Sequence, residues 1–201
     1  MTHPLLTRNR AWAAGREADD PGYFERNAQV HAPHTLYIGC SDARVPANIV
    51  TDTHIGEMFV HRNVANQARP FDASFGASLQ YAVEVLGVTD IVVCGHQECG
   101  GVKASLSGGA PGTVDAWLEP IKMIARVHRH ELDELDEHER VHRLVHLNVE
   151  EQIDALSRNP VVTAAWERGQ RLVLHGWVYS LTSGHLDEVV RIEGVQASAA
   201  K

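Results

Sequence analysis

The stretch Gly95-His96-Gln97-Glu98-Cys99-Gly100-Gly101 marks the point where a buried strand gives way to a helix. It follows the apolar run Ile-Val-Val-Cys at 91–94, which is typical of a buried parallel strand. The glycine pair allows a tight turn, and we expect a helix to begin there. The positive end of that helix favours the thiolate form of Cys99. His96 and Cys99 can direct an imidazole nitrogen and a thiolate at one cation, and these donors suit zinc.

A lone His-x-x-Cys pair can equally be two buried loop residues, but a second stretch has the same design. Tyr-Ile-Gly-Cys-Ser-Asp-Ala-Arg-Val-Pro at 37–46 is an apolar run that ends at Cys40 and continues with polar residues and a proline. The carboxyl ends of parallel strands meet at one edge of a sheet. Cys40 is therefore predicted to meet His96 and Cys99, with Asp42 as a possible fourth ligand.

Three blocks of the sequence together resemble the signature of the β-class carbonic anhydrases. They are Cys-Ser-Asp-Ala-Arg at 40–44, Phe-Val-His-Arg-Asn-Val-Ala-Asn at 59–66 and the Gly-His-x-x-Cys-Gly-Gly block at 95–101. They occur in the family's order and at compatible spacing, and the resemblance extends from about residue 35 to residue 192. It implies a lyase that reversibly hydrates carbon dioxide to bicarbonate and a proton. One Zn²⁺ per chain, held by Cys40, His96 and Cys99, would supply hydroxide for the attack.

The resemblance also assigns a catalytic dyad to Asp42 and Arg44. Arg44 can hold the carboxylate by a bidentate contact, and Asp42 can then orient the reacting water. If this pairing breaks, Asp42 could become the fourth zinc ligand in a closed, inactive site. The alternative reading is a surface ion pair worth less than about 1 kcal/mol.

The family's substrate pocket maps onto five positions of this chain. Phe59, Val64 and Tyr81 match residues that line an apolar carbon dioxide pocket, although each could equally be a core residue. Gly100 and Gly101 are expected to supply backbone donors near the substrate.

One subgroup of the family is inhibited by bicarbonate in a second pocket built from a tryptophan, an arginine and a tyrosine. Arg62 and Tyr179 match two of these positions, and Tyr37 stands where the tryptophan would be. A tyrosine fills part of the same space. Bicarbonate regulation, with Asp42 as the moving ligand, is therefore a hypothesis for this chain.

The composition favours an ordinary globular chain and argues against several partners. The 201 residues carry a net charge of −8 and are 44% hydrophobic, which argues against nucleic acid or an anionic membrane as the main partner. Three cysteines, two of them in a zinc-like pattern, indicate a reducing compartment rather than a disulfide framework. No secretory signal or membrane span is recognisable, so a cytoplasmic location is expected.

The chain is predicted to form one α/β domain over residues 1–201, with a mainly parallel sheet of about five strands flanked by helices. Residues 1–30 have too little apolar area to fold alone, and the resemblance favours a helical arm that packs on a partner subunit in a dimer or tetramer. Residues 195–201 are expected to be a loose tail. Strands are predicted at 35–40, 58–60, 91–94, 171–175 and 187–192. Helices are predicted at 45–50, at 72–86, from Thr113 as a cap onward, and from Asn159 to Gly169; residues 105–112 are predicted to be a loop.

Two other functions fit the same residues. A hydrolase of carbon disulfide or carbonyl sulfide would use the same metal site on a linear substrate, and only the shape of the access channel would separate it from a carbonic anhydrase. A non-catalytic zinc or bicarbonate-binding module would need four protein ligands, which Asp42 could complete. The Asp42–Arg44 pair argues against that module, because a structural site does not require it.

Overall fold

The computed structural model describes residues 3–194, so the predicted tail at 195–201 lies outside the described residues. The chain divides into two compact units, residues 1–32 and 33–201. In the first unit, helix α1 (Pro4–Asp19) and helix α2 (Tyr23–Gln29) meet through an edge-to-face contact between Trp12 and Phe24 at 5.4 Å. Residues 20–22 separate the two helices. Leu5, Leu6 and Trp12 are exposed, as expected of an arm that lacks a core of its own.

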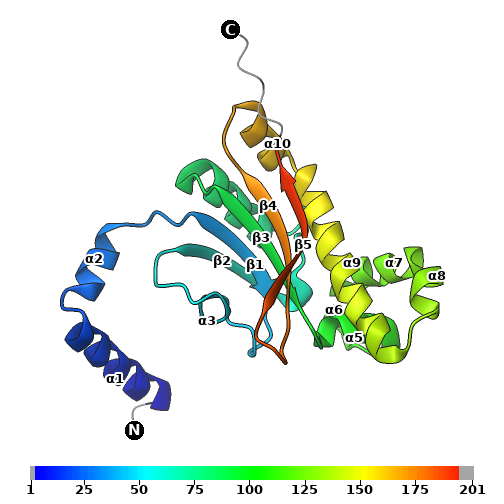
Figure 1. Ribbon diagram of the computed structural model, residues 1–201, viewed down its shortest axis with the longest axis horizontal. Helices are drawn as coiled ribbons and strands as arrows, with labels where there is room; N and C mark the ends of the chain where they lie inside the picture. Colours follow the sequence, from blue (N-terminus) through cyan, green and yellow to red (C-terminus); the bar gives the residue numbers. More distant parts are fainter. Residues whose placement is uncertain (1–2, 195–201) are drawn as a thin grey trace. The chain divides into compact units, whose positions relative to one another are not determined.

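The second unit is built on a five-stranded sheet in the order β2-β1-β3-β4-β5 (Figure 1). Its strands are β1 (Thr35–Cys40), β2 (Met58–Asn63), β3 (Asp90–His96), β4 (Val173–Tyr179) and β5 (Leu186–Glu193). The first four are parallel, and β5 is an antiparallel edge strand. The predicted fold class is therefore confirmed.

Strand β1 lies between β2 and β3, so the chain leaves β1 toward one side and later returns to its other side. The reversal of strand order falls between β1 and β3, and the carboxyl ends of the strands at such a point are where open α/β sheets bind ligands. Cys40 is the last residue of β1, and His96 is the last residue of β3.

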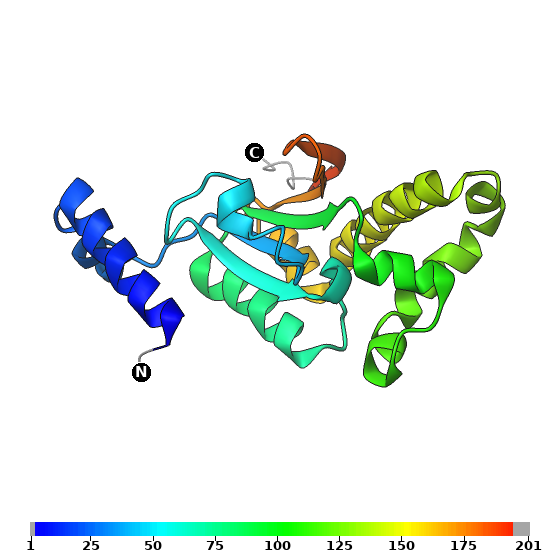
Figure 2. The same cartoon turned by 90° about the horizontal axis from the view of Figure 1, so that it is seen from below.

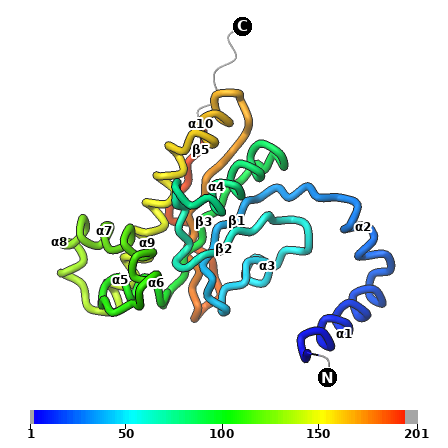
Figure 3. Tube along the Cα trace, turned by 180° about the vertical axis from the view of Figure 1, so that it is seen from behind, coloured from blue at the N-terminus to red at the C-terminus, as the bar shows by residue number. Residues whose placement is uncertain are grey.

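Helices on one face of the sheet enclose the main core (Figures 2 and 3). This face is covered by α4 (Ala73–Gln80), the π-helical turn η2 (Tyr81–Leu86), α9 (Glu137–Ser157) and α10 (Pro160–Glu167). The apolar stripe of α9 is buried. The opposite face carries a smaller cluster of Tyr37, Ala47, Val92 and Cys94, to which the short α3 (Ala47–Val50) contributes.

The remaining helices pack around a second core cluster, which contains Cys40 and Cys99. They are the 3₁₀ turn η1 (Val64–Asn66), α5 (Gly100–Ser107), α6 (Gly112–Trp117), α7 (Glu119–Val127) and α8 (Arg129–Asp133). None of the helices within residues 3–194 has the length and apolar character that a membrane crossing requires.

Several predicted boundaries were wrong. The loop predicted at 105–112 is shorter, because α5 continues to Ser107. Thr113 does not cap α6, since Pro111 occupies the cap position and the helix already begins at Gly112. The strand predicted at 171–175 begins two residues later and extends to Tyr179. By contrast, Asn159 caps α10 as predicted, with its side chain accepting a hydrogen bond from Val161 N.

Candidate metal centre

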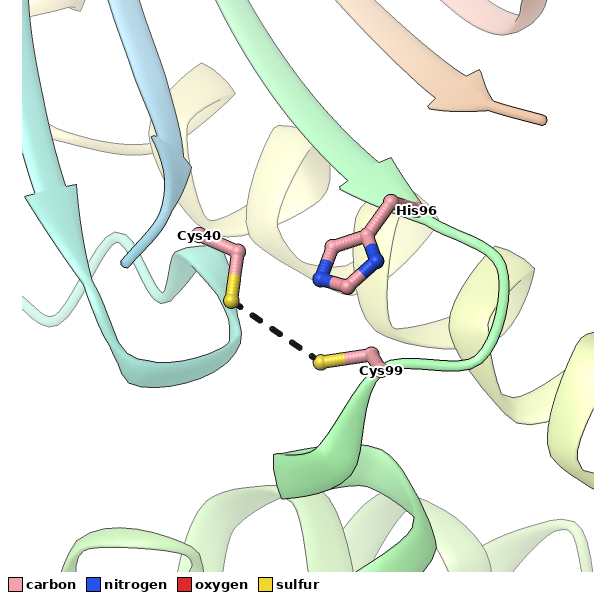
Figure 4. A group of neighbouring side chains, drawn as sticks. All are labelled: Cys40, His96 and Cys99. Atoms are coloured by element: carbon pink, nitrogen blue, oxygen red, sulfur yellow. Dashed lines mark hydrogen bonds between the residues drawn. The ribbon is translucent and has the colours of Figure 1, made fainter. Parts of the chain in front are cut away.

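The fold brings Cys40, His96 and Cys99 together at the carboxyl end of the sheet (Figure 4). Their ligand atoms all lie within 4.8 Å of one another, and all three residues are buried. The sulfur atoms of Cys40 and Cys99 are 4.0 Å apart. Among residues 3–194 this is the group of His, Cys, Asp and Glu side chains that could hold a metal ion.

The orientation of His96 fits a metal ligand. Its Nδ1 lies 2.8 Å from the carbonyl oxygen of Gln97, which can only accept, so Nδ1 carries the proton. Nε2 is then left with a lone pair, and this buried atom has no hydrogen-bond partner. An unpartnered buried nitrogen beside two thiol sulfurs is a donor set suited to zinc, whose ligands are neutral imidazole and thiolate.

The two cysteines interact strongly with each other. The pKa of Cys40 is lowered, first by its hydrogen bond with Cys99 and also by the backbone N–H groups of Asp42 and Ala65. The hydrogen bond with Cys40 and burial both raise the pKa of Cys99, although the N–H groups of Val102 and Gly101 at the start of α5 act in the opposite direction. The protein alone therefore favours one thiolate, and a bound cation would favour the second.

Asp42 lies beside this group but is held by Arg44. Arg44 Nε donates to Asp42 Oδ1 at 3.0 Å, Arg44 Nη2 donates to Oδ2 at 2.7 Å, and the Arg44 backbone N–H donates to Oδ1 at 2.9 Å. Asp42 Oδ2 is 3.9 Å from His96 Nε2. The Arg44 hydrogen bonds hold the pKa of Asp42 well below its usual range. In this arrangement Asp42 is a neighbour of the three ligand atoms and not part of their group.

The segment after His96 is shaped by contacts that the sequence did not indicate. Glu98 adopts a left-handed backbone with φ of 57°, which is uncommon for a residue with a side chain, and its carbonyl accepts a hydrogen bond from Arg44 Nη2 at 3.2 Å. The Gln97 N–H donates to the Tyr179 carbonyl at 2.9 Å. The Gln97 side chain contacts Ser180 and His142, from distant parts of the chain. Only the strand register and the position of α9 bring Ser180 and His142 to the Gln97 side chain.

Four of the five residues predicted to line the substrate pocket lie in two contacting pairs. The rings of Phe59 and Tyr81 lie 5.7 Å apart. Val64 packs against Gly101, where an added Cβ would lie 3.2 Å from Val64 Cγ1 and 3.0 Å from the Ala65 Cβ. Gly100 and Gly101 are the first two residues of α5, as predicted.

The residues predicted to bind regulatory bicarbonate lie as follows. Tyr37 is buried with Cys94 in the smaller cluster, and Tyr179 packs against that cluster. Burial raises the pKa of Tyr37 far above its usual value. The Arg62 guanidinium donates to two backbone carbonyls, those of Cys40 at 2.8 Å and Asp42 at 2.7 Å.

A buried group of two cysteine sulfurs and one imidazole at the switch point of a mainly parallel sheet is an α/β site that could hold a single metal ion. Comparison with known proteins identifies the family. The family model described as carbonic anhydrase matches residues 35–186. A carbonic anhydrase of Emericella nidulans is 42% identical over an alignment of 204 residues, gaps included, that covers all of this chain and 90% of that protein.

Solved structures agree with the family model. One of the two tetrameric β-carbonic anhydrases of Sordaria macrospora superposes with a TM-score of 0.89 and 40% identity, covering 94% of this chain and 96% of that chain. The Coccomyxa β-carbonic anhydrase in complex with acetazolamide gives a TM-score of 0.91 and 37% identity, covering 95% and 87%. The chain belongs to the β-carbonic anhydrase family and is a carbonic anhydrase, a lyase.

Proposed function

We propose that this protein interconverts carbon dioxide with bicarbonate and a proton at one zinc ion held by Cys40, His96 and Cys99. The observation that carries the proposal is the buried, unpartnered His96 Nε2, which faces two thiol sulfurs in a group whose ligand atoms span no more than 4.8 Å. Relatives that match nearly the whole chain are named carbonic anhydrases, which favours carbon dioxide over the linear sulfur gases.

Three protein ligands suit a catalytic zinc site, because a fourth position stays open for a reactant. When bound, zinc lowers the pKa of a water molecule at that position and so supplies a nucleophile near neutral pH. The protein fixes the geometry: the Gln97 carbonyl sets the His96 tautomer, and backbone N–H groups act on both sulfurs. Burial keeps bulk water away from the three ligands.

The Asp42–Arg44 dyad is proposed to orient the reacting water. The Arg44 side chain donates a hydrogen bond to each Asp42 oxygen, so the carboxylate is ionised and its orientation is fixed. Asp42 can therefore accept a hydrogen bond from the water while remaining a carboxylate. Phe59, Val64 and Tyr81 are proposed to offer apolar surface to carbon dioxide, and Gly100 and Gly101 to offer backbone donors.

Two finer proposals concern regulation and assembly. Breaking the Asp42–Arg44 contact would free Asp42 to become the fourth ligand, with bicarbonate acting through Arg62, Tyr37 and Tyr179. The arrangement described here is the one in which Arg44 holds Asp42. We also propose self-association as a dimer or tetramer, since the Sordaria macrospora relative is tetrameric and the first unit exposes apolar side chains.

Stopped-flow hydration of carbon dioxide by protein of known zinc content, from pH 6.5 to 9, tests the main proposal. Fast turnover that is lost in Cys40→Ser and blocked by acetazolamide, the compound bound in the Coccomyxa relative, is the expected result. Bound zinc with no turnover at any pH, or turnover of carbonyl sulfide or carbon disulfide alone, would overturn it. Unchanged activity with added bicarbonate at fixed pH, after correction for product inhibition, would remove the regulatory proposal.

A further inference from the structure

The turn η1, beside the metal centre, has a backbone that its sequence disfavours. Ala65 and Asn66 are both in the left-handed region, with φ of 64° and 48°. Residues with a Cβ avoid this region, and two in succession are rarer still. Surrounding contacts must therefore hold the turn in place.

Two buried amides on α9 supply such contacts. Asn148 Nδ2 donates to the Ala65 carbonyl at 3.1 Å. Gln152, one helical turn further on, donates to Asn148 Oδ1 at 3.1 Å and accepts from the Ala68 N–H at 2.8 Å. Asn148 is 1% exposed and Gln152 is 7% exposed, so water does not compete for these bonds. The two side chains hold both ends of the segment from Ala65 to Ala68.

The same turn touches both cysteine-bearing segments. Ala65 is fully buried in the cluster that contains both Cys40 and Cys99, and just before the turn the Asn63 carbonyl accepts a hydrogen bond from the Ser41 N–H at 2.8 Å. Ala65 also packs closely against Gly101, the second residue of α5. A Cβ added to Gly101 would lie only 3.0 Å from the Ala65 Cβ. A shift of the turn would therefore disturb the packing around Cys40 and press on the start of α5, which follows Cys99.

We propose that Asn148 and Gln152 are positioning residues for the metal centre, which hold the left-handed turn in place against the segments that carry Cys40 and Cys99. This rests on the proposed function only in that Cys40 is taken as a zinc ligand. The two amides touch neither the metal ligands nor the substrate. They act through the turn, because Asn148 binds the Ala65 carbonyl while Gln152 binds Asn148 and the Ala68 N–H, and such outer contacts tune ligand geometry and affinity.

The test compares Asn148→Leu and Gln152→Met, which keep side-chain size but remove the amide, with Leu156→Ala. Leu156 lies on the same helix in the core cluster that contains neither cysteine nor Ala65, so its variant is destabilised without removing a hydrogen bond to the turn. For each protein we would measure urea stability, the rate of zinc loss to a coloured chelator, and the thiolate-to-cobalt absorption bands of the cobalt-substituted form.

We expect zinc loss to be about tenfold faster or more in Asn148→Leu, with a smaller increase in Gln152→Met and a displaced thiolate-to-cobalt band in both. Leu156→Ala should keep the wild-type band and zinc-loss rate despite its lower urea stability. Equal zinc loss in Asn148→Leu and Leu156→Ala, with an unchanged band, overturns the inference. If Asn148→Leu does not fold, Gln152→Met decides by the same comparison. A different result would contradict the proposed function: wild-type protein that binds cobalt without thiolate-to-cobalt bands, or that does not hydrate carbon dioxide.

Discussion

Three hydrogen bonds join Arg44 to Asp42 beside the metal centre. Two guanidinium nitrogens and the Arg44 backbone N–H all donate to the Asp42 carboxylate. Arg44 Nη2 also donates to the Glu98 carbonyl, one residue before Cys99. Arg44 therefore links the segment after β1 to the segment after β3, and both segments carry residues of the site.

Replacing Arg44 should impair catalysis without removing the metal. In Arg44→Gln the Asp42 carboxylate loses its bidentate partner, so the water it orients is held less firmly. We expect kcat/KM to fall about 10- to 100-fold while zinc content stays near one per chain. Arg44→Lys should recover little, because an ammonium cannot reproduce the fork. Stopped-flow rates and metal analysis on the same samples check this; loss of zinc in Arg44→Gln would instead assign Arg44 a structural role.

The Asp42–Arg44 pair should also make the free energy of unfolding depend on pH. Arg44 holds the pKa of Asp42 below its ordinary value of about 3.9. A carboxyl group with a depressed folded-state pKa contributes stability above its unfolded pKa, and this is lost as pH falls toward the folded value. Metal-free wild type should therefore lose free energy of unfolding more steeply than metal-free Arg44→Gln as pH falls below about 5. Urea unfolding at several acid pH values measures this, and parallel curves would contradict it.

Cys94 and Cys40 should differ in function. Cys94 lies on the opposite face from Cys40, and burial raises its pKa to about 12, so it stays a thiol. We expect Cys94→Ala to keep zinc and turnover at a cost on the order of 1 kcal/mol in stability. Cys40→Ser should lose both zinc and turnover. Metal analysis after exposure to a chelator distinguishes them, and zinc loss in Cys94→Ala would show that the smaller cluster supports the site.

His175 supports the sheet at the end remote from the metal centre. Its Nε2 lies 2.9 Å from Asp90 Oδ1 and its Nδ1 lies 2.8 Å from Glu188 Oε1, so it links β3 to the edge strand β5. Hydrogen bonding to His175 lowers the pKa of Glu188. In His175→Leu two carboxylates lose a shared partner, and we expect a loss of about 1–3 kcal/mol in stability. Thermal unfolding measures the loss, and the zinc-loss rate of the folded protein should stay at the wild-type value.

Much of this architecture could be predicted from the sequence, because local patterns determine it. Apolar runs that end at Cys40 and near His96 indicated parallel strands, and Asn159 before Pro160 indicated a helix start. The strand β4 was placed too early because Gly176 interrupts its apolar pattern. An added Cβ there would lie 2.8 Å from a Val149 side-chain atom, so the glycine belongs inside the strand, where α9 packs closely.

The surroundings of the site were less predictable because they depend on register and helix placement. His96 pairs with Tyr179 across β3 and β4, and this register brings Ser180 to the Gln97 side chain. Nothing near Gln97 in the sequence indicates that contact. The Asn148 contact with Ala65 spans 83 positions and depends on where α9 crosses the sheet.

The glycine pair at the start of α5 offers a matched test of packing against the site. A Cβ on Gly101 would meet the Ala65 Cβ at 3.0 Å, Val64 Cγ1 at 3.2 Å and Leu118 Cδ2 at 3.3 Å, whereas a Cβ on Gly100 meets nothing within 4 Å. Neither glycine has a positive φ, so backbone strain does not separate them. Gly101→Ala should therefore lose about 1–3 kcal/mol by overpacking, a fall in Tm of several degrees.

Gly100→Ala, in the same turn of the same helix, should be neutral or raise stability by up to about 1 kcal/mol, because alanine reduces the entropy of the unfolded chain. Calorimetry of the two zinc-loaded variants makes the comparison. Because Gly101→Ala pushes on Ala65, it should also speed zinc loss, as the turn that packs in one cluster with Cys40 and Cys99 moves. Equal stability of the two variants would mean that the turn at 64–66 yields easily, which is difficult to reconcile with a turn held by Asn148.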